Sequence, residues 1–291
     1  PLDTLPTHLD AMTATPHAEQ RLPRDLGGWA CLFDVAQLPV LGDTAERLEE
    51  ARTHEDSVDA HWLSEAICSD PLLTIKLHAH VGYLRRGRDS GEPETVTAAL
   101  VMLGIPPFFN HFGPQPTVED ALLSNPLAWE GFQAVLRRSH RAANFATSFA
   151  LQRLDHDVAV IQSAALLHDF AELLLWLQAP PLALEMLRRQ RADPQLRSAD
   201  VQRELMGITL PELQRELMRR WRLPSVLQHT ADDTRHADSA QARTVLLAVR
   251  LARHTALGWD NPALPDDIRD IADLLHLGEV PTQHLLHTLD L

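Results

Sequence analysis

The chain has 291 residues and a mass of 32.5 kDa, which is enough for one large domain or two smaller ones. Its apolar content of 45% and charged content of 23% are typical of a globular protein and argue against a disordered one. Two cysteines exclude a disulfide scaffold. A net charge of −14 argues against nucleic acid as a partner, because an acidic chain repels the phosphate backbone.

The same features bear on location and on fold class. With no apolar leader at its start and no long uncharged apolar run, the chain is expected to be cytoplasmic and outside the membrane. Because it opens with Pro, we expect it to be a fragment of something longer. The chain contains 50 Leu but only 15 Val and 7 Ile, and since strands favour β-branched residues, this ratio predicts an all-α fold.

The amino-terminal part predicts a tail followed by short helices. Residues 1–30 carry scattered Pro, Thr and His without periodicity, and are interpreted as a tail or linker with room for one short helix. Asp70-Pro71 is a strong helix start, because Asp accepts free backbone N–H groups and Pro has none to leave unpaired. Ser57 is a candidate cap, and Gly104, followed by two prolines, predicts a helix end. The helices predicted here cover residues 43–53, 57–68, 71–81 and 95–104.

The second part of the chain predicts longer helices. A short helix follows Thr117, and residues 158–177 form the most apolar segment, which is typical of a central, buried helix. Thr209 and Glu212 match a capping box. The remaining predicted helices cover residues 126–154, 182–191, 198–206, 209–221, 240–257, 265–276 and 282–289.

A polar pair interrupts this apolar segment. His168 and Asp169 lie between Leu167 and Phe170, and a buried carboxylate needs partners because an unpaired one is costly. The two side chains could bind a metal ion, with His140 of the preceding helix as a third ligand if the helices pack antiparallel. Imidazole and carboxylate ligands suit Zn, Mn or Fe.

These residues, with four upstream and downstream segments, resemble a known family. The segments are Leu38–Val40, Ile67–Leu77, Ala99–Gly104 and Trp221–Pro224. Together with His140 and the His168-Asp169 pair, they resemble the HDOD (HD-related output domain) family, a branch of the HD superfamily of metal-dependent phosphohydrolases, over residues 36–235. The resemblance implies an amino-terminal helical subdomain at residues 31–115 and an HD-like helical subdomain with carboxy-terminal helices at 116–291.

The chain departs from an active HD enzyme at several positions. The register places Arg253 where such an enzyme has a further Asp, and Ala171-Glu172 replaces a Gly-Lys pair. We therefore expect a degenerate site of His140, His168, Asp169 and Arg253, with no bound metal or cofactor. In that case a protein cation or hydrogen-bond donors balance the charge of Asp169, with His140 or an arginine of residues 250–253 as candidates.

The resemblance implies a bacterial signal-transduction output module that is not an enzyme. Its expected partners are other signalling proteins, a second copy of the chain, or a nucleotide or cyclic dinucleotide in the groove between the subdomains. Arg137, Arg138 and Arg141 are the candidate ligand or partner surface. The alternative is a metal-dependent phosphohydrolase with Mn, Fe or Zn that acts on a nucleotide or cyclic dinucleotide.

Overall fold

The computed structural model describes residues 22–54, 58–87, 91–193, 195–232 and 239–290. Every regular element in these ranges is a helix, apart from one isolated bridge between Val40 and Thr117. The expected all-α fold is therefore confirmed. The proposed cap Ser57 and residues 1–21 of the expected tail lie outside the described ranges.

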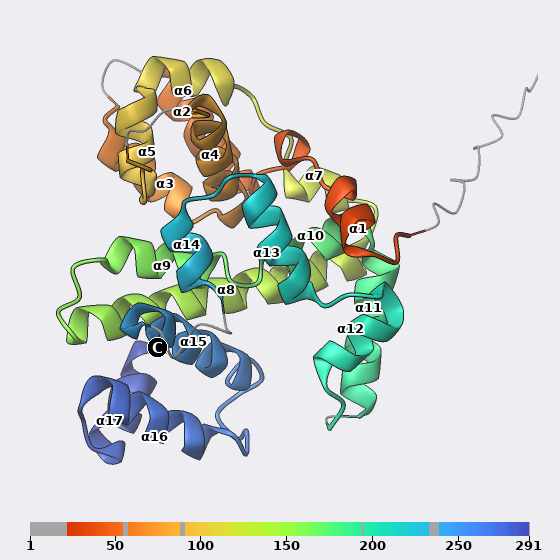
Figure 1. The fold of residues 1–291 in the computed structure, drawn as a ribbon, viewed down its shortest axis with the longest axis vertical. Coiled ribbons are helices and arrows are strands. Elements are labelled where there is room, and N and C mark those ends of the chain that lie inside the picture. The colour runs from red at the N-terminus through yellow and green to blue at the C-terminus, as the bar shows by residue number, and fades with distance from the viewer. Residues whose placement is uncertain (1–21, 55–57, 88–90, 194, 233–238, 291) are drawn as a thin grey trace, which may run out of the picture.

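Five helices form a smaller subdomain, which Figure 1 shows at one end of the molecule. Its core contains Leu63, Ile67, Leu100 and Phe108, and all four side chains are fully buried. The five helices are α2 (Gly42–Thr53), α3 (Ala60–Cys68), α4 (Pro71–Leu84), α5 (Val96–Leu103) and α6 (Ile105–His111).

Helix α4 belongs to two cores at once. Leu73 and Leu77 pack in the smaller core, whereas Leu72 and Ile75 pack in the core of the larger subdomain. Residues four apart, or three apart, share a helix face, so the sequence pattern gives α4 two apolar faces. The start of α4 is as predicted, because Asp70 caps it by accepting hydrogen bonds from two backbone N–H groups.

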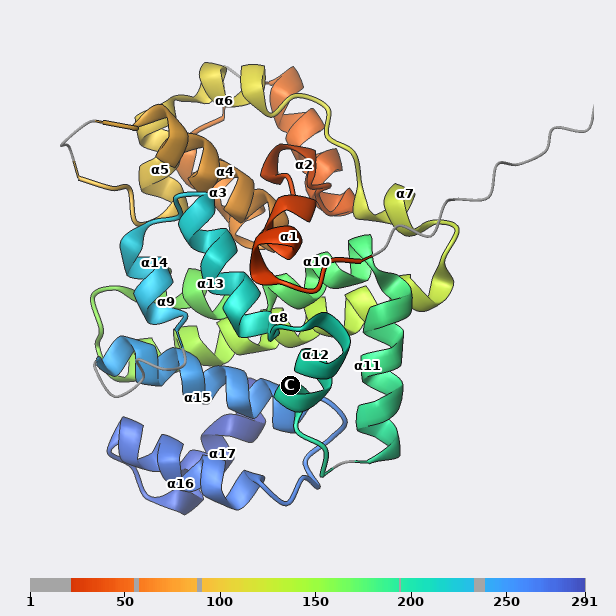
Figure 2. The same cartoon turned by 45° about the vertical axis from the view of Figure 1, so that its right-hand side comes forward.

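The larger subdomain is built around the long helix α8 (Pro126–Gln152), which α9, α10 and α15 contact along its length. Figure 2 shows α13 and α14 on one side of α8 and α15 on another, with α11 beside α10 and α12 packed on α11. The surrounding helices are α7 (Val118–Leu122), α9 (Val158–Leu166), α10 (Phe170–Gln178), α11 (Pro180–Ala192), α12 (Ser198–Met206), α13 (Leu210–Arg220), α14 (Ser225–Thr230), α15 (Ala240–His254), α16 (Leu264–Leu275) and α17 (Glu279–Leu289).

The amino-terminal boundary differs from the prediction. The short helix for which residues 1–30 left room is α1 (Leu26–Leu32), but it packs against α13 instead of forming part of a tail. Trp29 is fully buried in the larger core, and its Nε1 donates a hydrogen bond to the Met206 carbonyl at 3.1 Å. A short segment lacks visible helical periodicity, so burial of one Trp was not predictable from the pattern.

Two further starts and stops were not predicted. Ile105-Pro106-Pro107 was interpreted as a break, and it also begins α6, because Pro in the first turn is already restricted to helical φ.

The segment Val158–Gln178 is long and apolar enough to cross a membrane by length and composition, and 78% of its most apolar window is buried inside the fold. This segment is divided into α9 and α10 at residues 167–169.

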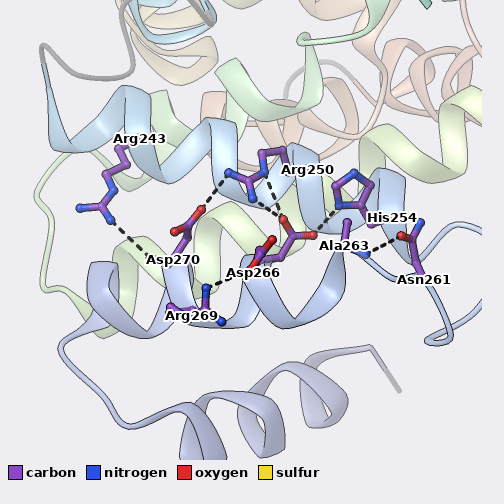
Figure 3. Close-up of polar contacts among 9 residues, drawn as sticks. Arg243, Arg250, His254, Asn261, Ala263, Asp266, Arg269 and Asp270 are labelled. Carbon is purple, nitrogen blue, oxygen red and sulfur yellow. Dashed lines mark hydrogen bonds and ion pairs between the residues drawn. The ribbon is translucent and has the colours of Figure 1, made fainter. Parts of the chain in front are cut away.

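Helix α16 is held to α15 by a cluster of charged residues around a buried acid. Asp267 of α16 is fully buried and accepts hydrogen bonds from Arg250 Nε at 3.1 Å and from His254 Nδ1 at 2.5 Å. Arg250 also pairs with Asp270 at 3.0 Å, and Figure 3 shows Arg250, His254 and Asp270 between α15 and α16. This cluster fixes the position of α16 on the bundle.

Candidate functional site

The site is centred on the break between α9 and α10, where the chain makes a turn at Leu167, His168 and Asp169. Asp169 takes the N-cap position of α10, but its side chain makes no capping hydrogen bond. The carboxylate is therefore available for other partners. His168 is 6% exposed and Asp169 is 8% exposed, so the pair is held inside the larger subdomain.

Two guanidinium groups contact the Asp169 carboxylate, one on each oxygen. Arg138 Nε of α8 donates to Oδ2 at 2.8 Å, and Arg253 Nη2 of α15 donates to Oδ1 at 2.6 Å. His168 Nδ1 lies 3.1 Å from Oδ1. Arg138 also donates to Glu172 Oε2 of α10 at 2.6 Å, so two arginines and two carboxylates form one continuous network.

The network sets the charge of its members. Burial alone would raise the pKa of Asp169, but Arg253, Arg138 and His168 together hold that pKa well below its ordinary value. Burial likewise acts to lower the pKa of Arg138, whereas Glu172 and Asp169 raise it above its usual range. Asp169 is thus a carboxylate, and both arginines are cations, throughout the physiological pH range.

The structure does not bring His140 to this network. The His140 side chain, on α8, instead donates from Nε2 to the backbone carbonyl of Ser69, at 2.7 Å. Ser69 follows α3, so His140 connects the long helix of the larger subdomain to the smaller subdomain. The predicted group of four residues is reduced to His168, Asp169 and Arg253, and Arg138 takes the place expected for His140.

The three arginines proposed as a binding surface have separate roles. Arg138 is a member of the Asp169 network, as described above. Arg141 forms a bidentate pair with Asp290, with both N–O distances 2.8 Å, and so anchors the end of α17 to α8. Arg137 is exposed. Because two of the three side chains are engaged inside the fold, they do not form a continuous cationic surface.

The residues at this centre do not fit a metal ion. Within the described residues, no group of three or more His, Cys, Asp or Glu side chains is arranged to hold one. The two candidate ligands that do converge, His168 and Asp169, face a guanidinium group rather than a third ligand. Metal sites of this class need several neutral or anionic donors, and cations in contact with the carboxylate oppose a further cation.

A cavity of about 560 Å³ opens beside the network. Arg138, Asp169, Glu172 and Arg253 form part of its wall, with contributions from α11, α12 and α13. Further along, the lining arginines Arg203 and Arg215 are accompanied by two more acids, Glu212 and Asp232. The cavity is large enough for a small molecule, and its positive and negative groups are closely balanced.

Two members of the network, Arg138 and Glu172, were not assigned to it from the sequence. Arg138 precedes His140 by two residues and therefore lies on another face of α8, so spacing alone did not connect it with Asp169. Glu172 follows Asp169 by three residues on α10 and was noted only as a departure from the family pattern. The useful signal was the need of Asp169 for a cation, but only packing identifies which cation supplies it.

Comparison with known proteins agrees with this architecture. The chain is similar in structure to the MmoQ response regulator of Methylococcus capsulatus str. Bath, with a TM-score of 0.62 and 22% identity over 82% of this chain and 98% of that one. It is also similar to a virulence factor of Campylobacter jejuni subsp. jejuni, with a TM-score of 0.65 and 20% identity over 91% of this chain and 94% of that one. No curated protein matches the chain.

At these levels of identity the two solved structures show a shared fold. The family model of the HDOD domain matches residues 38–236, which include the smaller subdomain, the Asp169 network apart from Arg253, and helices α7 to α14. This match covers more than half of the chain, and the chain therefore belongs to the HDOD domain family.

Proposed function

We propose that the protein is a signal-transduction output module that regulates partners by binding and does not hydrolyse phosphoesters. The observation that carries this proposal is the contact between Arg253 and Asp169, with Nη2 2.6 Å from Oδ1. The Arg253 guanidinium balances the negative charge of the Asp169 carboxylate. The Asp169 centre then acts as a structural connection between α8, α10 and α15.

The electrostatics of the network support this role. At about 4 Å and an effective dielectric constant near 20, a divalent cation and one guanidinium repel by about 8 kcal/mol. Two guanidinium groups contact Asp169 from opposite sides. A metal-activated water needs an open coordination position beside anionic or neutral ligands. The present arrangement offers fixed positive charge in that place, which favours a regulatory role over a hydrolytic one.

The proposal also accounts for the partners expected from the sequence. Membership of the HDOD domain family supports binding to other signalling proteins, and the protein from Methylococcus capsulatus with the same fold is named a response regulator. Binding to a small ligand or to a second copy of the chain is compatible with the same role. One observation supports the alternative function, a metal-dependent phosphohydrolase, because the retained His168-Asp169 pair lines the cavity described above.

Metal binding by a matched variant distinguishes the two functions. In Arg253→Asp a carboxylate replaces the cation beside Asp169, so we expect Mn²⁺ to raise the thermal unfolding midpoint of this variant and to leave that of the wild type unchanged. Wild-type protein is expected to be inactive on bis(p-nitrophenyl) phosphate with Mn²⁺, Fe²⁺ or Zn²⁺. Stoichiometric metal in the purified wild type, together with turnover of that substrate, would contradict the proposal.

A further inference from the structure

A second cavity, of about 360 Å³, lies between the two subdomains. One wall is α4 of the smaller subdomain, and the facing wall is the end of α13 with the turn that follows it, from the larger subdomain. The short helix η1 (Val35–Gln37) and the segment after α6 complete the lining. We call this cavity the inter-subdomain cleft. It is separate from the cavity beside Asp169.

The cleft is lined by basic groups from both subdomains. Lys76 comes from α4, and Arg220 and Arg222 come from the end of α13 and the turn after it. Among the described residues that line it, none is Asp or Glu. The cavity beside Asp169, by contrast, matches its arginines with acids. In a chain with a net charge of −14, cations gathered without lining acids produce a local potential that attracts anions.

Lys76 is the only lysine in the chain, and it is 6% exposed. Its Nζ donates to the Leu38 carbonyl at 2.6 Å and to Gln115 Oε1 at 2.5 Å, and both acceptors are neutral. Burial lowers the pKa of Lys76 to about 8, against the opposing influence of Asp70 and Asp34. An anion in the cleft would stabilise the charged form of this amine.

Arg220 is available for a stronger acceptor than the one it has. Its two terminal nitrogens lie 3.3 and 3.4 Å from Cys31 Sγ, and a thiol sulfur is a weak acceptor. A phosphate oxygen would form shorter, charge-assisted hydrogen bonds with the same guanidinium. Arg220 can therefore exchange a weak internal contact for a ligand.

The cleft also offers flat ring surfaces. His80 of α4 and His111 at the end of α6 are stacked, with ring centroids 3.5 Å apart. Burial lowers the pKa of both rings, and the influence of His111 on His80 and of Lys76 on His111 adds to it, so the pair is uncharged at neutral pH. Tyr83, at 67% exposure, lies at the rim. Aromatic and imidazole surfaces are well suited to stacking against a nucleobase.

The position of the two walls depends on a close backbone contact. A Cβ atom on Gly82 of α4 would lie 2.5 Å from the carbonyl oxygen of Arg222, so only glycine permits this approach. Arg222 has φ of +56°, a left-handed conformation that is uncommon for a residue with a side chain. The chain thus keeps an unfavourable conformation at the point that places Arg222 at the cleft.

We propose that the inter-subdomain cleft binds a nucleoside monophosphate, with the phosphate on Lys76, Arg220 and Arg222 and the base against His80 and His111. The volume of about 360 Å³ is at the low end of the range for ligand pockets, which favours one nucleotide over a dinucleotide. Because the contacts come from both subdomains, the ligand would hold them together. A regulatory effect of this ligand rests on the proposed function, whereas binding of the ligand can be tested independently.

Calorimetric titration of the whole chain with AMP and with GMP tests the site, with adenosine, guanosine and inorganic phosphate as probes of each half. We expect a mononucleotide to bind and its nucleoside and free phosphate to bind at least about tenfold more weakly. Arg220→Gln and Arg222→Gln should each weaken binding about tenfold. Arg219→Gln is the matched control, because Arg219 lies next to Arg220 on α13, pairs with Glu216 and is outside the cleft.

Absence of mononucleotide binding, or equal binding by both cleft variants and the control, would overturn the proposal. Tighter binding of a cyclic dinucleotide would overturn the choice of a mononucleotide, and equal binding of inorganic phosphate would overturn the role of the rings. Incubation followed by chromatography separates this inference from the proposed function. Hydrolysis of the nucleotide would contradict the regulatory proposal, whereas retention of intact nucleotide would support it.

A second measurement uses the single lysine. Protein labelled with ¹³C-lysine gives one ε-methylene resonance, from Lys76. We expect this resonance to titrate near pH 8 without ligand and at higher pH with the mononucleotide, because a bound phosphate favours the ammonium form. A resonance and a titration midpoint that are unchanged at saturating nucleotide would show that the phosphate lies elsewhere.

Discussion

Asp169 shows how one buried carboxylate is balanced by the protein around it. Its two oxygens each accept a hydrogen bond from a different arginine, and these arginines come from α8 and α15. Taking charges out of water is costly, and that cost is offset only when every partner is present and well placed. The network is therefore a connection whose loss affects three helices together.

Substitution of Asp169 should destabilise the fold. In Asp169→Ala, Arg138 and Arg253 lose their shared counter-charge, and we expect the free energy of unfolding to fall by about 3–5 kcal/mol without added metal. Urea unfolding followed by circular dichroism measures this change. Asp266→Ala is the control, because the Asp266–Arg269 pair is exposed and should contribute less than about 1 kcal/mol. An unchanged unfolding curve for Asp169→Ala would contradict the structural role.

His78 is a second buried polar residue, and it lacks the partners that Asp169 has. Neither ring nitrogen has a hydrogen-bond partner in the described structure, and the side chain is 1% exposed. Burial lowers the pKa of His78 from 6.5 to about 4. A buried polar group without partners costs free energy, so replacement by an apolar side chain of similar size should be favourable.

The expected effect of His78→Leu depends on pH. The unfolded chain takes up a proton at His78 near pH 6.5, whereas the folded imidazole stays neutral to about pH 4. Folding stability is therefore lost as the pH falls through this interval, by roughly 3 kcal/mol in total. His78→Leu should be more stable at pH 7 and should lose less stability in acid. Urea curves at pH 7, 5.5 and 4.5 test this, with exposed His61→Leu as the control.

Helices α8 and α10 pack closely because a glycine lies at their contact. A Cβ atom at Gly131 of α8 would approach the ring of Trp176 of α10 to 2.4 Å, which is shorter than any normal contact. The same approach places Arg138, two turns further along α8, near the start of α10. Contact between the two helices thus supports the geometry of the Asp169 network.

Gly131→Ala separates helix propensity from packing. In an isolated helix, replacement of Gly by Ala is favourable by about 1 kcal/mol. Here the added methyl group collides with a rigid indole, and we expect a net loss of about 1–3 kcal/mol in the free energy of unfolding. Thermal and urea unfolding measure the sign. A stabilised variant would show that the Trp176 ring moves easily and that the contact is not tight.

Across the molecule, the two hydrophobic cores both include residues of α4. The two subdomains also contact each other where Gly82 of α4 packs against the turn after α13. His140 adds a hydrogen bond from α8 to the end of α3. These contacts hold the subdomains in one arrangement and position the two walls of the inter-subdomain cleft. A ligand that contacts both walls would strengthen the same arrangement.

Gly82→Ala should disturb this arrangement without removing a charged group. Its methyl group would lie 2.5 Å from a backbone carbonyl, which cannot rotate away as a side chain can. We expect a loss of about 1–3 kcal/mol in stability and faster amide exchange in the turn after α13. Hydrogen-exchange mass spectrometry measures the second effect. Unchanged exchange in that turn would mean that the subdomains adjust to the added group at no cost.

The sequence by itself determined features that depend on neighbours along the chain. Asp70-Pro71 begins α4, and Thr209 and Glu212 form the predicted capping box. Each signal works because a side chain satisfies backbone groups only two or three residues away. The Leu-rich composition gave the all-α class for a similar reason, since propensity is a local property.

Only the tertiary structure decided the remaining features, because they depend on residues far apart in sequence. The turn at 167–169 releases Asp169 to two arginines, of which Arg138 was not identified, and His140 has a partner 71 residues away in another subdomain. Trp29 is buried by helices that follow it by more than a hundred residues. Packing in three dimensions determines which counter-charge and which core contact each residue has. The periodicity of the sequence does not identify the distant residue that makes the contact.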